Sequence, residues 1–123
     1  TLLTSTDGLS WRAARSGTGN LLLGVAHGAG RWVAVGARGT LLTSTDGQTW
    51  QALRSGTGED LLGVAHGGGR WVAVGSGGAI LTSTDGLNWH TVGLGMGNLL
   101  YGVAHGGGRW VAVGSGGTIL TSP

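Results

Sequence analysis

The sequence repeats itself at a fixed interval of 39 residues, and this period constrains the fold more than any other feature. Residues 1–39, 40–78 and 79–117 align without a gap, and residues 118–123 begin a fourth copy. Gly63–Gly78 and Gly102–Gly117 are identical, which indicates recent amplification or design. A period of about 40 residues is typical of units that stack on one another. We therefore expect residues 1–123 to form a single repeat domain.

Each repeat contains four short segments with the composition of β-strands. Between Leu61 and Val92 these segments are Leu61–His66, Arg70–Gly75, Ala79–Thr84 and Asn88–Val92. Their β-branched and aromatic residues favour extended backbone, and Gly-rich turns separate them. The sequence predicts an all-β fold, namely a β-propeller built of four-stranded antiparallel blades with three repeats per chain. A solenoid of β-hairpins is the alternative architecture.

Composition excludes several classes of protein. The 29 glycines recur at fixed positions and 40% of residues are hydrophobic, so the chain can bury a core despite its glycine content. There is no cysteine, which excludes disulfides and Cys-based metal sites. No apolar run approaches the roughly 20 residues that span a bilayer. The seven arginines are scattered, not clustered, so we expect neither a nucleic acid nor a membrane as partner.

The motif S-T-D-G-x-x-W recurs in register at residues 5–11, 44–50 and 83–89. It resembles the Asp-box, or BNR repeat, of sialidases, sortilin-like receptors and photosystem assembly-factor propellers, in a shortened variant with Asp and Gly adjacent. The resemblance covers nearly the whole chain and favours an extracellular location. It implies a structural turn in which the Asp carboxylate accepts amide hydrogens and the Trp packs beneath. The residues concerned are Asp7, Asp46, Asp85, Trp11, Trp50 and Trp89.

Resemblance to sialidases would imply an arginine triad, a nucleophilic Tyr with its Glu partner, and a further acid. The chain has one Tyr, Tyr101, one Glu, Glu59, and one Asp outside the repeated turns, Asp60. Glycosidases need two carboxylates that flank the bond, whereas neighbours along a strand point to opposite faces. We expect no catalytic residues and no cofactor, so a glycosidase fragment is the least favoured interpretation.

The hairpin between the first two strands carries the same His and Arg in every repeat. If the propeller closes, these side chains form a ring that could hold a metal ion or an anion. No carboxylate stands nearby to orient the imidazoles, so we expect each His to pack against its own hairpin and no metal to bind. The six residues are still candidate binding residues: His27, His66, His105, Arg31, Arg70 and Arg109.

The links between repeats vary, while the hairpins and turns scarcely do. Where repeats are otherwise nearly identical, the segments that differ are where individual binding specificity resides. The links therefore supply a second group of candidate binding residues, on the opposite face: Asn20, Arg38, Glu59, Asp60 and Asn98. We therefore expect a non-enzymatic binding or assembly scaffold, for example a multivalent lectin-like module that binds glycans. The alternative is a purely structural, self-assembling or engineered propeller with no ligand.

Three repeats are fewer than the four to eight blades of most propellers. Two chains supply six, so we expect a homodimer with its two-fold axis along the channel. In this arrangement Ser10–Ala14 is the fourth strand of the partner's last blade, a strand-sharing closure. Thr1–Thr6 and Thr118–Pro123 then duplicate one strand, and only one of them can occupy it. Either one end is displaced, or the sequence is a fragment of a longer propeller.

Overall fold

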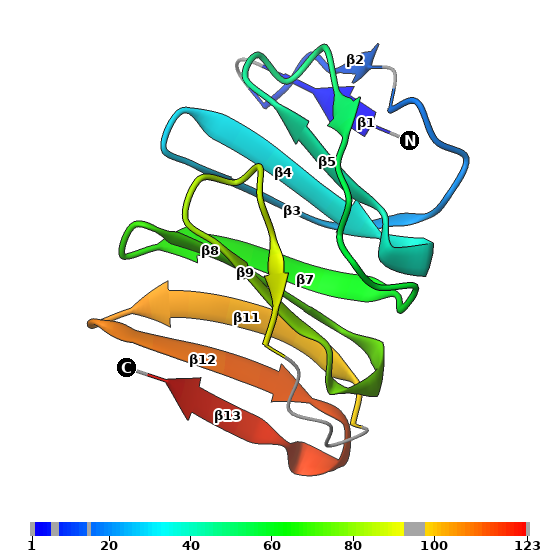
Figure 1. Ribbon diagram of the computed structural model, residues 1–123. Coiled ribbons are helices and arrows are strands. Elements are labelled where there is room, and N and C mark those ends of the chain that lie inside the picture. Colours follow the sequence, from blue (N-terminus) through cyan, green and yellow to red (C-terminus); the bar gives the residue numbers. More distant parts are fainter. Residues whose placement is uncertain (1, 6–7, 15, 93–97, 123) are drawn as a thin grey trace.

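The computed structural model describes residues 2–5, 8–14, 16–92 and 98–122 (Figure 1). Its regular elements are thirteen short strands and three single turns of 3-10 helix. In chain order they are β1 (Leu2–Thr4), β2 (Arg12–Ala14), β3 (Leu22–Gly28), β4 (Arg31–Gly36), η1 (Ala37–Gly39), β5 (Leu41–Ser44), β6 (Gln51–Ala52), β7 (Leu61–Gly67), β8 (Arg70–Gly75), η2 (Ser76–Gly78), β9 (Ile80–Ser83), β10 (His90–Thr91), β11 (Leu100–Gly106), β12 (Arg109–Gly114), η3 (Ser115–Gly117) and β13 (Ile119–Ser122).

The strands form three successive antiparallel sheets and one short pair. The first sheet has the order β3-β4-β5-β6, the second β7-β8-β9-β10 and the third β11-β12-β13, while β1 and β2 form an N-terminal strand pair. The predicted all-β class and the repeated antiparallel sheets are confirmed. Within the described residues the sheets lie face to face as an open stack (Figure 1). No helix in the described part of the chain is long and apolar enough to cross a membrane.

Strand bounds follow the sequence prediction closely, with two differences. The fourth strand is only His90–Thr91, shorter than the predicted Asn88–Val92, because residues 84–89 form the turn that precedes it. In addition, the first strand contains a β-bulge: Leu61 pairs with Gly75 and Gly63 with Val74, so Leu62 is the extra residue. Regular alternation would place Leu61 and Val64 on opposite faces, yet both belong to one core cluster.

The hydrophobic core lies between the sheets, in two layers. Between the first and second sheets, Val33 and Val35 meet Val64 and Trp71. Between the second and third sheets, Val72 and Val74 form the matching layer with these residues: Leu100, Ala112, Val103 and Trp110. Each layer joins β4 or β8 of one sheet to the first two strands of the next. A single repeat therefore buries its apolar face only against a neighbour, as stacked repeats require.

Glycines let the first strands of adjacent sheets approach at backbone distance. A Cβ on Gly24 would lie 3.3 Å from Gly63 Cα, and a Cβ on Gly63 would lie 3.2 Å from Gly102 Cα. These contacts are tighter than side chains usually make, so β3, β7 and β11 run closely side by side. A side chain at any of these glycines would hold the sheets apart, so the close approach depends on this column of glycines.

Candidate functional site

The S-T-D-G turn joins the third and fourth strands of a sheet, and its carboxylate is held by the turn itself. Asp85 Oδ1 accepts hydrogen bonds from the amides of Leu87 and Asn88, both at 2.8 Å. Ser83 Oγ, which donates to the same carboxylate, accepts the Gly86 amide at 2.8 Å. The turn after β5 repeats this pattern around Asp46. Asp7 lies outside the described residues.

These hydrogen bonds shift the acidity of both turn carboxylates. The Asn88 and Leu87 amides, followed by the Asn88 side chain and Ser83, hold the pKa of Asp85 well below its usual range. The amides of residues 49 and 48, with a smaller contribution from Ser44, lower the pKa of Asp46. Each carboxylate is stabilised as an anion that accepts several donors, so it is suited to holding a turn and unsuited to giving or taking a proton at neutral pH.

The Trp that follows each turn closes it from below. Trp50 Nε1 donates to the Gly47 carbonyl at 2.9 Å, and Trp89 Nε1 donates to the Gly86 carbonyl at 3.0 Å. Both indoles are half-buried. Trp11, which directly precedes β2, makes the equivalent bond to Gly8 at 3.2 Å but is largely exposed.

We predict from the lowered carboxylate pKa values that the fold loses stability in acid. A folded-state pKa below the unfolded value stabilises the fold above about pH 4, and this contribution disappears as the pH falls toward the lowered pKa. The urea midpoint should therefore be constant from pH 7 to 5 and fall between pH 4 and 2. Asp85→Asn should lower the midpoint at pH 7 and flatten its acid dependence. Urea titrations at pH 7, 5, 4 and 3 measure both effects, and an identical acid slope in the variant would contradict the prediction.

At the hairpin end of each sheet, the imidazole and indole of one hairpin form a ring pair. The centroids of His27 and Trp32 lie 4.6 Å apart, and the equivalent pairs in the second and third sheets repeat this at 4.6 and 4.7 Å. His66 also covers Gly28 of the preceding sheet, and His105 covers Gly67 in the same way. His66 and His105 are thus packed between the Trp of their own hairpin and a glycine of the preceding sheet. Among the described residues, no group of three or more potential ligands is placed to hold a metal ion.

The hairpin arginines lie across the sheet from threonines of the third strand. Arg31 Nη1 donates to Thr43 Oγ1 at 3.0 Å, and Arg70 Nη1 donates to Thr82 Oγ1 at 3.3 Å. The Arg31 side chain also contacts the next sheet, since a Cβ on Gly86 would lie 3.0 Å from its Cδ. Arg70 and Arg109 are exposed, so their guanidinium groups are accessible along the hairpin end.

The second group of candidate residues lies at the opposite end, near η1, η2 and η3. Asn20 Nδ2 donates to Thr40 Oγ1 at 2.9 Å, and Asn98 Nδ2 donates to Thr118 Oγ1 at 2.8 Å. In the second repeat this position is Glu59, and the Thr is replaced by Ala79. The two asparagines thus brace their own sheets, while Glu59 is exposed in a different setting.

One contact at this end joins two sheets through residues that occur only once. The Arg38 amide donates to Asp60 Oδ1 at 3.0 Å. Arg38 has φ 59, a left-handed conformation that costs free energy for a side chain other than glycine. The equivalent positions are Gly77 and Gly116. The structure therefore brings Arg38 and Asp60 together, as an exposed polar pair between the first and second sheets.

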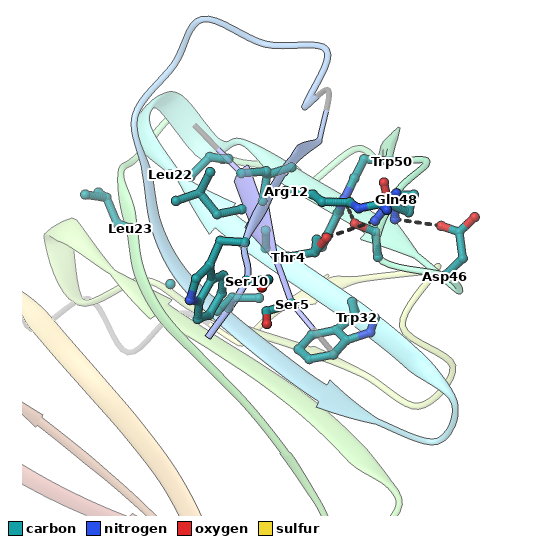
Figure 2. Close-up of a pocket in the computed structure, with 17 residues that line it drawn as sticks. Thr4, Ser5, Ser10, Arg12, Leu22, Leu23, Trp32, Asp46, Gln48 and Trp50 are labelled. Atoms are coloured by element: carbon teal, nitrogen blue, oxygen red, sulfur yellow. Dashed lines mark hydrogen bonds between the residues drawn. The ribbon is translucent and has the colours of Figure 1, made fainter. Parts of the chain in front are cut away.

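A hollow of about 980 Å³ lies between the N-terminal strand pair and the first sheet. Figure 2 shows Leu22 and Trp32 on the side of the first sheet, with Thr4 bonded to Gln48 at 2.9 Å across the hollow. No pattern in the sequence predicts this hollow. The repeat alignment contains a related signal, since residues 1–14 match only the third- and fourth-strand positions of a repeat.

Comparison with known proteins adds no assignment to these features. No protein-family model matches the chain, and no curated protein matches it significantly.

Proposed function

We propose that the chain is a non-enzymatic binding and assembly scaffold of the propeller class, which presents one ligand-binding unit several times along its hairpin end. The observation that carries this proposal is the repetition of the His–Trp–Arg arrangement with ring separations of 4.6, 4.6 and 4.7 Å. Units that are repeated on a rigid stack bind a repeated ligand with avidity, even when each contact is weak.

Charge and chemistry favour glycans that carry a carboxylate or sulfate group. The exposed Arg70 and Arg109 offer planar donor groups that match such anions, and the net charge of the chain is +2. Trp71 is 1% exposed, so it supports the hairpin and does not offer a stacking surface. The ligand is therefore expected to contact Arg and His, not the indole.

The arrangement of the carboxylates supports a binding role over catalysis. Asp46 and Asp85 are engaged by the amides of their own turns. Glu59 and Asp60 are neighbours in sequence at the end of the stack away from the hairpins. A glycosidase would instead place two carboxylates on either side of one sugar bond.

A glycan array followed by titration of the strongest binder tests the proposal. We expect signals restricted to acidic glycans, which weaken as salt is raised because the contacts are exposed and charged. Arg70→Ala should weaken binding about 10-fold, which corresponds to the loss of one charge-assisted contact. Arg54→Ala is the matched control, since this exposed arginine lies in the link after β6, away from the hairpin end. A uniformly silent array would favour the purely structural alternative.

A further inference from the structure

Adjacent sheets in the stack pack together through two different surfaces, and each end of the stack exposes one of these two surfaces. We call the outward surface of β3 and β4 the N-face and the outward surface of β11, β12 and β13 the C-face. On the N-face Val25 is 56% exposed, whereas its equivalent Val64 is 9% exposed between the first two sheets. The indole of Trp32 is 38% exposed, while that of Trp71 is 1% exposed.

The C-face shows the complementary pattern. Val113 is 45% exposed, but the equivalent Val35 and Val74 are completely buried. Ile119 is 67% exposed, whereas Leu41 at the same repeat position is 1% exposed. The core between the first and second sheets is built from this same pair of surfaces, so an N-face and a C-face fit each other by repeat equivalence.

Each interface between sheets contains a contact between a histidine and a glycine, and each end of the stack exposes one of these two partners. In the stack, His66 covers Gly28 and His105 covers Gly67, so that no Cβ could be accommodated at either glycine. A Cβ on Gly106, the equivalent glycine of the C-face, would have nothing within 4 Å. His27, the equivalent imidazole of the N-face, is exposed. Gly106 and His27 are thus the two halves of a third such contact.

The strands at the two ends are also complementary, because one end has a third strand and the other end has a fourth strand for it to pair with. In the third sheet β13 is the outer strand among the described residues, whereas β5 and β9 each pair with a fourth strand. β2 occupies the fourth-strand position of its repeat and pairs with β1, with Leu3 opposite Ala13. The register Leu42–Ala52 of the first sheet predicts that Leu120 would take the place of Leu3 beside Ala13.

From these observations we infer that the C-face of one copy docks on the N-face of a second copy, with β13 replacing β1 beside β2. β11 and β12 then fill the hollow between the N-terminal strand pair and the first sheet (Figure 2). The exchange replaces an isolated two-stranded pair by a complete four-stranded sheet, and such isolated pairs are marginal in water. Two copies that dock head to tail twice form a closed dimer. This inference rests on the proposed scaffold, and it names a second copy of the chain as the partner.

The exposed area of the chain is consistent with one such partner. The chain exposes 6836 Å², whereas a compact monomer of its 12.2 kDa exposes roughly 6,100 Å². The chain thus exposes roughly 700 Å² more than a compact monomer of its mass, as expected of a stack whose two end faces are uncovered.

Light scattering on a sizing column, with one variant on each face, tests the docking. The unaltered chain should have twice the mass of 12.2 kDa. Val25→Arg and Val113→Arg should each raise the dissociation constant at least 100-fold and yield folded monomers, because each places a charge inside the interface. Leu87→Arg, at an exposed turn position, should leave the dimer unchanged. Circular dichroism confirms that each variant is folded.

A mixture of the two face variants distinguishes head-to-tail docking from other dimers. The Val25→Arg chain keeps an intact C-face and the Val113→Arg chain keeps an intact N-face, so together they should form a 1:1 complex with one interface. A monomeric unaltered chain, a dimer that neither variant weakens, or a mixture that stays monomeric would overturn the inference. A dimer that binds no glycan would contradict the proposed ligand and leave the docking supported.

The strand exchange has its own test, made simple because the chain contains no cysteine. Ala13→Cys combined with Leu120→Cys should form a disulfide-linked dimer under mild oxidation. Ala13→Cys combined with Leu3→Cys, the matched control, should remain largely reduced in the dimer, because β1 no longer lies beside β2. An efficient disulfide between positions 3 and 13 of this control, within dimeric protein, would overturn the exchange.

Discussion

Trp71→Ala should destabilise the chain by about 3–5 kcal/mol, the usual cost of deleting a large buried aromatic side chain. Trp71 is 1% exposed and belongs to the core layer that joins the first and second sheets. Its indole also supports the following turn, since a Cβ on Gly86 would lie 3.1 Å from Trp71 Nε1. The substitution therefore leaves a cavity and removes support from the S-T-D-G turn. The expected fall in the melting temperature is about 10–20 °C.

Trp32→Ala is the matched control, because Trp32 occupies the same repeat position with 38% of its surface exposed. Both substitutions are best made in the Val113→Arg background, where association between copies does not contribute. In that background Trp32→Ala should cost clearly less than Trp71→Ala, since less apolar surface leaves the core. Thermal unfolding followed by circular dichroism gives the comparison. Equal destabilisation would show that the indole is not held by the neighbouring sheet.

Most of the fold could be predicted from the sequence because every local signal is repeated three times. The hairpins carry Gly-Gly at positions 68–69 and 107–108, and all four residues have positive φ, as a tight hairpin turn requires. The first repeat has Ala29 in place of the first glycine, and it adopts φ 51 without altering the hairpin. A single unfavourable residue is therefore overridden by the pairing of the flanking strands.

The bulge at Leu62 could not be predicted from the alternation of residue types. The segment begins with two leucines, and either could face the core in a regular strand. The structure makes room for both by inserting an extra residue opposite Gly75 and Val74. This depends on how the sheet packs against its neighbours, which is information that no local pattern contains.

The candidate site likewise contains local features that the sequence predicts and contacts between repeats that it does not predict. The hydrogen bonds of Asp46 and Asp85 follow from local turn chemistry, since Asp accepts amides two and three residues ahead. The packing of His66 on Gly28 and the contact between Arg38 and Asp60 join different repeats. Such contacts depend on the distance and offset between sheets, so they became visible only in three dimensions.

Gly75→Ala should be as damaging as the loss of a core side chain, although it adds only one methyl group. Gly75 ends β8 in extended backbone, so the cost comes from space and not from φ. A Cβ on Gly75 would overlap the Asp60 carbonyl oxygen and lie 2.9 Å from the carbonyl carbon. That carbonyl is held in place because it accepts the Ser76 amide at 2.9 Å. Since neither side of the clash is a flexible side chain, we expect a cost of about 3 kcal/mol or more, at the upper end of overpacking.

Gly58→Ala provides the control, because a Cβ there would meet nothing within 4 Å and the backbone is not left-handed. It should change stability by less than about 0.5 kcal/mol, or raise it slightly by restricting the unfolded chain. Urea unfolding of both variants measures the difference, and similar midpoints would contradict the prediction. The same overlap recurs at Gly36 with Leu21 and at Gly114 with Leu99. The glycine that ends each R-W-V-A-V-G strand is thus required by the close passage of the link that enters the sheet, which explains why the three repeats share it.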